Sequence, residues 1–290
     1  MVKNLLNVPD YNLILIDAMN YAYISYYGRK NLSWKGKPTG MIFGVMSLYF
    51  KLRLRYPRAR IIFIWEGTRN RRKDISEDYK SGRTKKTDDF KESLKEIRLA
   101  LKKVDVDQMW HVGLEADDLA GYLTTQAKDK EKVLLISNDE DWMQYMKPNV
   151  DLYRKGMAES YEDIKTILGF PPEKMGMWKM LKSDTSDGVK GIKRMPSDVA
   201  VCLITNCSNY RQLKKYNLKK HNPSWESWTK KIQDEWPRLE KNAELLLYHS
   251  DWIREEDIMC VHGKILPKTA LKRFLNSYGM TSLSKRVDRL

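Results

Sequence analysis

The sequence predicts an α/β fold with a mainly parallel sheet and helices on both of its faces. Short apolar runs with the length and composition of buried strands recur in the first half of the chain. They span residues 12–18, 60–65, 108–112 and 133–137. Helical patterns separate these runs, at residues 41–56, 88–103 and 115–128. Strands that alternate with helices are typical of parallel sheets, because each parallel connection has to cross a face of the sheet.

The second half of the chain has a different pattern. From about residue 160 onward strand patterns are scarce, helical patterns dominate, and Pro171, Pro172, Pro196 and Pro223 interrupt them. We place a boundary near Gly156. The prediction is an α/β core over residues 1–156 and a helical region over residues 157–290.

The composition points to a polyanionic partner. The 290 residues include 53 Lys and Arg against 38 Asp and Glu, a formal charge of +15. An excess of this size favours nucleic acid over a membrane surface. The alternative is a basic protein whose charges are simply solvated.

Several classes of protein are disfavoured. The longest apolar stretch, residues 41–50, is too short to cross a bilayer, so we expect no membrane span. We expect no signal peptide, and a reduced, cytoplasmic protein. Three cysteines are too few for a disulfide framework, and no CxxC pair exists. Of the four histidines only His262 lies near a cysteine, Cys260, so a zinc site is not expected.

Acidic residues follow each predicted strand. In an open parallel sheet ligands bind beyond the carboxyl ends of the strands, so these carboxylates should meet at one rim. Two further acids follow in the segment LKSDTSDGVKG. The predicted metal ligands are Asp17, Glu66, Glu115, Asp117, Asp118, Asp139, Asp141, Asp184 and Asp187.

Carboxylates brought so close together repel one another unless cations neutralise them. Oxygen ligands without His or Cys favour magnesium, with manganese as a substitute. Two such ions about 4 Å apart can activate water and stabilise the leaving oxygen of a phosphodiester. The alternative for Asp118 and Asp141 is that each caps a helix N-terminus.

The segments that carry these acids resemble the flap endonuclease and 5′-3′ exonuclease family. The resemblance extends to its phage members, including the phage ribonuclease H of this family, and to the 5′ nuclease domain of bacterial DNA polymerases. It covers roughly residues 13–199. The matching pieces are LILIDAMNYAY, IFIWEGTRNRRK, SEDYKSGR, GLEADDLAGYL, LLISNDEDWMQYM and LKSDTSDGVKGI, in the family's order.

The resemblance implies roles for these positions. Asp17, Glu66, Glu115, Asp117 and Asp118 resemble the family's first group of metal ligands, and Asp139, Asp141, Asp184 and Asp187 resemble the second. Tyr79, Lys80 and Arg83 match a YKxxR segment, which implies that Lys80 and Arg83 act on the scissile phosphate. That segment leads into a helical arch, expected at about residues 69–90, which admits the 5′ single strand.

The family also has a helix-turn-helix element that binds duplex through a glycine-rich turn and a potassium ion. Gly188 and Gly191 are kept, but Arg194 and Pro196 stand where glycines are expected. These departures argue against the potassium site. Glu66 stands where the family commonly has aspartate.

Basic residues flank the predicted metal site. Arg69, Arg71 and Arg72 lie just after the strand that leads to Glu66, and Tyr79 offers a ring on which a base can stack. Lys190, Lys193 and Arg194 begin three residues after Asp187 and are expected to hold duplex phosphates. A solvated basic face is the alternative for both groups.

The resulting hypothesis is a monomeric, structure-selective 5′ nuclease. Its substrate would be DNA or a DNA/RNA hybrid with a 5′ single strand or flap, and its role replication or primer removal, alongside replication proteins. If it is encoded by a phage, it would work in the host cytoplasm. Two alternatives remain: a single-strand ribonuclease with a related acidic core, and a non-catalytic nucleic-acid binder.

Overall fold

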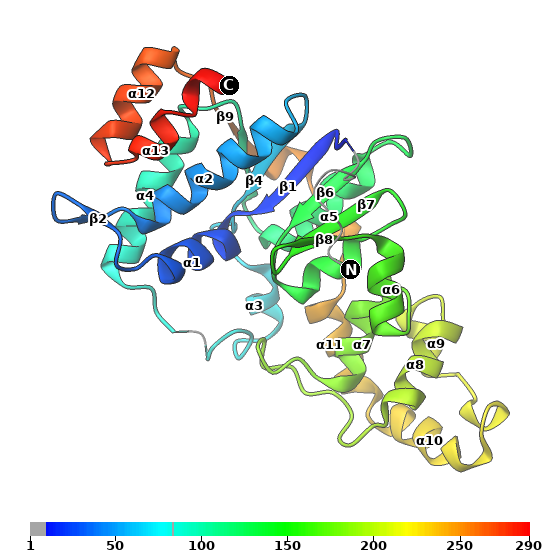
Figure 1. Cartoon of the computed structure of the whole chain (residues 1–290). Coiled ribbons are helices and arrows are strands. Elements are labelled where there is room, and N and C mark those ends of the chain that lie inside the picture. Colours follow the sequence, from blue (N-terminus) through cyan, green and yellow to red (C-terminus); the bar gives the residue numbers. More distant parts are fainter. Residues whose placement is uncertain (1–9, 83) are drawn as a thin grey trace.

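The computed structural model describes residues 10–82 and 84–290, and its centre is a seven-stranded mixed sheet (Figure 1). The strand order is β8-β7-β6-β1-β4-β5-β9. The five inner strands are mutually parallel, and the two edge strands, β8 and β9, are antiparallel to their neighbours. The strands of the sheet are β1 (Leu13–Asp17), β4 (Arg60–Ile64), β5 (Asp107–His111), β6 (Val133–Ile136), β7 (Val150–Arg154), β8 (Met157–Glu159) and β9 (Ile258–His262). The predicted mainly parallel sheet is confirmed.

The inner strands are apolar on both faces because helices cover both faces. Along β1, Leu15 belongs to one buried cluster, while Ile14 and Ile16 belong to the other. Five helices lie against the second cluster: α1 (Ala18–Gly28), α2 (Gly40–Arg55), α4 (Asp88–Leu101), α12 (Lys268–Ser277) and α13 (Thr281–Ser284). A small hairpin, β2 (Ser33–Trp34) and β3 (Lys37–Pro38), precedes α2.

The other face is covered mainly by the second half of the chain (Figure 1). The helices that cover this face are α5 (Ala116–Gln126), α6 (Tyr161–Leu168), α7 (Met175–Lys182), α8 (Ser197–Asn206), α9 (Tyr210–Leu213), α10 (Glu226–Asp234) and α11 (Trp236–Leu246). The helical character predicted beyond residue 160 is confirmed. Strand β9 was not predicted, and it returns to the sheet from that half to pair with β5.

Short helices and loops complete the chain. The helix α3 (Arg71–Ile75) is the only helix within the described part of residues 69–87. Of the residues expected to form a helical arch, 76–82 and 84–87 form turns and loops, and they lie outside the sheet before α4 begins (Figure 1). The 3₁₀ helices are Glu140–Tyr145 (η2), Pro172–Lys174, Leu218–Lys220, Pro223–Trp225, Ser250–Trp252, Glu255–Asp257 and Val287–Arg289. Within the described ranges, every helix falls short of the length and apolarity that a membrane crossing requires.

Candidate active site

The carboxyl ends of four parallel strands bring acidic residues to one edge of the sheet. Asp17 is the last residue of β1, and Glu66 follows β4 by two residues. Glu115 is the N-cap of α5 after β5, and Asp139 is the N-cap of η2 after β6. The predicted meeting of these acids at one rim follows from the parallel order of the strands.

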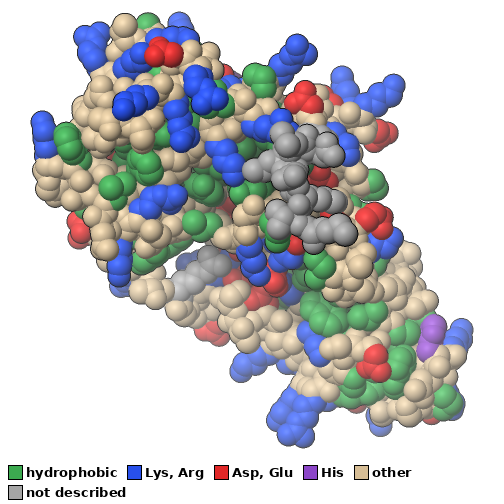
Figure 2. Space-filling view, in the orientation of Figure 1, with side chains coloured by type: hydrophobic (Ala, Val, Ile, Leu, Met, Phe, Trp, Pro, Cys, Tyr) green, Lys and Arg blue, Asp and Glu red, His purple; other side chains and the backbone are tan. Residues whose placement is uncertain are grey.

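Five of the nine predicted ligands form two overlapping groups. Asp117, Asp139 and Asp141 form one group, and Asp141, Asp184 and Asp187 form the other. Within each group the ligand oxygens lie within 4.8 Å of one another. Asp141 belongs to both groups, so the arrangement offers two adjacent sites with one shared carboxylate. The space-filling view shows acidic side chains gathered in a hollow near the middle of the molecule, with basic side chains beside them (Figure 2).

Asp17 and Glu66 border these groups. Asp17 is buried and accepts hydrogen bonds from the amide of Asn20 and the hydroxyl of Ser137, both at 2.9 Å. Glu66 accepts one from the amide of Ala116 at 3.3 Å. The next residue must be glycine, since a Cβ on Gly67 would lie 2.3 Å from the carbonyl oxygen of His111. This close crossing of the two chain segments after β4 and β5 holds Glu66 beside the start of α5.

Burial, together with neighbouring negative charge, raises the pKa of several carboxyls. Burial, opposed by the hydrogen bond from Asn20 and assisted by the nearby Glu66, raises the pKa of Asp17 to about 7. Burial raises the pKa of Asp141 to about 6, although Lys179 lowers it. Burial and Asp139 hold the pKa of Asp117 well above its usual range. Oxygen-only donors under this mutual repulsion fit hard divalent cations, which would favour the ionised forms.

These shifts predict how stability depends on pH without metal. A carboxyl whose pKa is higher in the folded state than in the unfolded state binds its proton more tightly when folded. These groups therefore destabilise the protein above pH 7, and the destabilisation is relieved as the pH falls through 7 and 6 toward 5. In EDTA we expect the free energy of unfolding in urea to rise by on the order of 3 kcal/mol between pH 8 and pH 5.

The variant Asp17→Asn is the control for this pH dependence, because it removes the carboxyl whose pKa is raised to about 7. Its stability should depend less on pH than that of the wild type. Saturating magnesium should flatten or reverse the wild-type trend. A wild-type stability that falls steadily from pH 8 to pH 5 in EDTA would contradict the prediction.

Two lysines lie among the carboxylates. Lys80 Nζ lies 2.5 Å from Glu115 Oε1 and 3.6 Å from Asp187 Oδ2. Lys179, on α7, lies 2.5 Å from Asp141 Oδ1 and 2.8 Å from Asp184 Oδ2. Lys179 was not predicted from the sequence, because a single lysine on an amphipathic helix carries no signal of its partners.

Lys80 is held in a constrained position. Its φ is +57°, in the left-handed region that non-glycine residues rarely adopt, and its amide bonds the carbonyl of Asp187 at 3.3 Å. Such strain persists where the surroundings fix the backbone, and it is common at functional sites. Trp142 is another residue of the site that was not predicted from the sequence. Its Nε1 donates a hydrogen bond to Asp117 at 2.7 Å.

Tyr79 corrects one expectation. Its ring is 3% exposed, and its hydroxyl donates to Asp187 at 2.9 Å and lies 3.1 Å from Glu115. A ring enclosed in this way offers no face to a base. Tyr79 links the segment before α4 to the carboxylates. Its neutral hydroxyl donates a hydrogen bond to them without adding a positive charge.

Arg72 and Asp118 also depart from their predicted roles. Arg72 is buried, and its Nη2 bonds Asp118 Oδ1 at 2.7 Å while Nη1 bonds Asp118 Oδ2 at 2.5 Å. Asp118 accepts from the amide of Glu115 at 3.3 Å, which completes a capping box at the start of α5. The alternative of a helix cap is confirmed for Asp118, and its carboxylate belongs to neither ligand group. Arg72 is not exposed to bind nucleic acid.

The remaining predicted residues occupy different settings. Arg69 and Arg71 are exposed near the site, with Arg71 over the ring of Trp252 at 4.5 Å. Arg83 lies outside the described residues. Lys190, Lys193 and Arg194 are exposed in the connection between α7 and α8.

That connection has its own geometry. Asp184 and Val189 exchange two backbone hydrogen bonds of 2.8 Å across a tight turn. A Cβ on Gly191 would lie 2.3 Å from the carbonyl oxygen of Leu181, so only glycine fits there. Arg194 takes a φ of +61°. The helix-turn-helix element stays a prediction.

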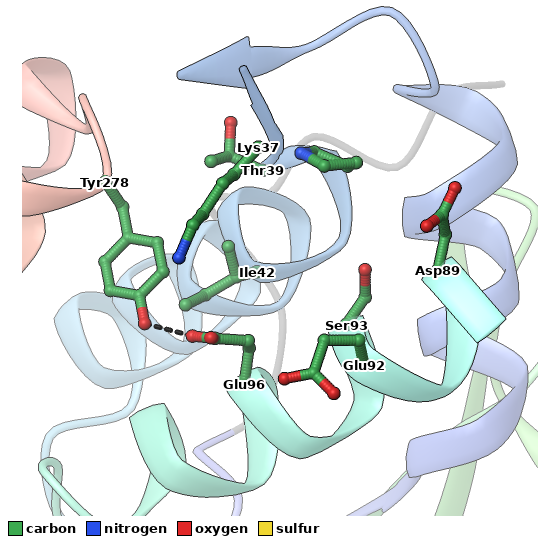
Figure 3. A pocket seen from close by; sticks show the side chains of 9 residues that line it. Lys37, Thr39, Ile42, Asp89, Glu92, Ser93, Glu96 and Tyr278 are labelled. Carbon is green, nitrogen blue, oxygen red and sulfur yellow. Dashed lines mark hydrogen bonds between the residues drawn. The ribbon is translucent and has the colours of Figure 1, made fainter. Parts of the chain in front are cut away.

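A separate pocket lies between β3, α2, α4 and Tyr278 (Figure 3). Asp89, Glu92 and Glu96 line it, and Tyr278 donates to Glu96. None of the predicted site residues lines it, so it is distinct from the carboxylate groups.

Comparison with known proteins gives one consistent result. Residues 12–169, more than half of the chain, match the model of the N-terminal resolvase-like domain of 5′-3′ exonucleases. A 5′-3′ exonuclease of Buchnera aphidicola is 29% identical over 71% of this chain and 74% of its own length. A 5′-3′ exonuclease of Aquifex aeolicus is 27% identical over 96% of each chain.

A solved structure shares the fold. It is the flap endonuclease of bacteriophage T5 in a complex with DNA and metal ions. The TM-score is 0.66 at 20% identity, over 81% of this chain and 88% of that one.

Proposed function

Since the chain belongs to the family of 5′-3′ exonucleases, we propose that it is a structure-selective 5′ nuclease that uses two magnesium ions. It would hydrolyse phosphodiesters of branched, nicked or RNA-primed duplex during replication or primer removal. The observation that supports this is the pair of carboxylate groups that share Asp141. A cytoplasmic location, phage origin, a monomeric state and partner replication proteins stay predictions.

The two groups support a specific choice of metal ligands. Asp117 and Asp139 would hold one ion, Asp184 and Asp187 the other, and Asp141 would contact both. Bound divalent ions supply activation of water and neutralisation of charge on the phosphodiester. Glu115 is held by Lys80 and Tyr79, so it orients these residues as much as it adds charge. Lys179 keeps Asp141 and Asp184 together.

A substrate panel tests the proposal. The substrates are a 5′-flap duplex, a nicked duplex, an RNA-primed duplex and single-stranded RNA, each with magnesium, with manganese and with EDTA. We expect metal-dependent cleavage near the junction of the flap. Preferential degradation of single-stranded RNA would favour the ribonuclease alternative, and binding without cleavage in any metal would favour a non-catalytic binder.

Lys80 should act on the chemical step. Its ammonium lies among the carboxylates, 9% exposed at the side chain, where a cation stabilises charge that builds on a reacting phosphate. We expect Lys80→Met to lower the single-turnover rate on a 5′-flap by about 10²–10³-fold, with little change in Kd. The matched control is Lys73→Met, an exposed lysine of α3. A loss of affinity at an unchanged rate would make Lys80 an ordinary phosphate contact.

Lys190, Lys193 and Arg194 should hold the duplex without reading its sequence. Phosphate binding by basic side chains releases counterions, so the slope of log K against log salt should flatten by about 0.9 for each phosphate that is no longer neutralised. We expect the triple alanine variant to weaken duplex binding alike for all sequences. The control is the triple alanine variant of Lys264, Lys268 and Lys272. An unchanged slope in the first variant would place the duplex elsewhere, such as over residues 211–220.

A further inference from the structure

Three residues with metal-binding side chains meet at the end of the sheet opposite the carboxylates. Asp107 is the first residue of β5, whose other end leads to Glu115. Strand β9 pairs antiparallel with β5 and places His262 directly opposite Asp107. Cys260 lies two residues before His262, and residues two apart in a strand point to the same face. The pairing therefore collects a thiol, an imidazole and a carboxylate on one side of the sheet edge.

The distances between these side chains are short. His262 Nδ1 lies 2.7 Å from Asp107 Oδ1, and Cys260 Sγ lies 3.7 Å from each of the two nitrogens of the same ring. We propose that Asp107, Cys260 and His262 bind a divalent cation of the zinc class, with a fourth position open to water. This site is separate from the magnesium site and independent of the proposed nuclease function.

The chemistry of the ligands selects the metal. Thiolate and imidazole prefer zinc to magnesium, which is bound by oxygen. In a tetrahedral zinc site neighbouring ligand atoms lie roughly 3.5 Å apart. The S–N separation of 3.7 Å already fits, and the N–O separation of 2.7 Å has to widen. The His262 side chain is 73% exposed, so its ring is free to make that adjustment.

Arg60 orients the carboxylate of Asp107. Its Nε and Nη2 both bind Asp107 Oδ2, at 2.8 Å and 2.7 Å. This leaves Oδ1 directed at His262 as the ligand oxygen. Metal-binding carboxylates are commonly oriented in this way by a hydrogen bond to their second oxygen.

The site joins two distant parts of the chain. Asp107 belongs to the core, and β9 returns to it after about 150 residues of mainly helical chain. An ion that binds only the folded arrangement stabilises that arrangement, here the docking of β9 on β5. Because the thiol and the imidazole must lose protons to bind, affinity should rise with pH.

Cobalt(II) is the probe for this site. Cobalt in a tetrahedral site with a thiolate gives strong visible bands, which report the geometry, and a charge-transfer band in the near ultraviolet, which oxygen ligands do not give. The titration uses the full chain at pH 7.5 with excess magnesium to occupy the carboxylates. We expect one such cobalt per chain, displaced by zinc.

The variants decide the assignment. Cys260→Ser should remove the thiolate band, and His262→Ala should weaken cobalt binding by at least about tenfold. Cys202→Ser is the control and should leave both unchanged. Circular dichroism and unfolding in urea report that each variant is folded, independently of any cleavage activity. Absence of the band from the wild type, its persistence in Cys260→Ser, or full affinity in His262→Ala would overturn the proposal.

Discussion

Replacing Asp141 with asparagine should reduce cleavage of a 5′-flap substrate by roughly 10³-fold at saturating magnesium. Asp141 is the carboxylate that both ligand groups share, so this one change alters both of the proposed metal sites. A bound ion supplies several kcal/mol of charge stabilisation to the transition state, and each 1.36 kcal/mol is tenfold in rate. Single-turnover rates at several magnesium concentrations give the measurement.

The same change should leave substrate binding and folding intact. Asparagine keeps the shape of the side chain, and the basic residues outside the hollow are untouched. Lys179 keeps its ion pair with Asp184 at 2.8 Å, so it does not become an unpaired buried cation. Asp89→Asn is the matched control, because Asp89 is exposed in α4 outside both ligand groups. A rate within threefold of the wild type would remove Asp141 from the metal site.

The sheet and the rim of carboxylates were predictable from local patterns. The apolar runs that became β1, β4 and β6 are short, uninterrupted and separated by helical patterns, and parallel order then placed Asp17, Glu66 and Asp139 at one edge. Strand β9 carried no such signal. Its residues IMCVH are only partly buried, and β5, its partner, lies about 150 residues earlier. A pairing over that distance is set by the packing of the intervening helices.

The roles of similar residues within one segment were not predictable. Arg69, Arg71 and Arg72 look alike in a basic run, yet two are exposed and the third is buried. Asp117 and Asp118 are adjacent, yet one belongs to a ligand group and the other to an ion pair. Successive residues of a helix point about 100° apart, so one faces the hollow and its neighbour faces the core. Burial and partner decide each role, and both come from the tertiary fold.

Replacing Arg72 should therefore lower the free energy of unfolding, and it should not directly weaken the binding of nucleic acid. Arg72 pairs with Asp118, and it donates to the carbonyl oxygens of Leu245 at 2.8 Å and Leu247 at 3.3 Å. It thus ties α3 and the start of α5 to the end of α11. Removing one partner of a buried ion pair leaves an uncompensated charge, which costs about 3–5 kcal/mol. We expect Arg72→Met to lower the free energy of unfolding by that amount in urea.

Two further variants separate stability from binding. Arg71→Met removes an exposed neighbour, and its effect on the free energy of unfolding should stay within about 1 kcal/mol. Combining Arg72→Met with Asp118→Leu removes both buried charges, and apolar replacement of a whole buried pair is often neutral. The double variant should recover much of the stability that Arg72→Met removes, short of the bonds to the two carbonyls, the contact of Arg72 with Glu115 at 3.4 Å and the capping bond that Asp118 accepts from the Glu115 amide. Wild-type stability in Arg72→Met together with weakened duplex binding would instead return Arg72 to the nucleic-acid surface. Recovery in the double variant would show that the pairing with Asp118 is why an arginine is buried beside the metal site.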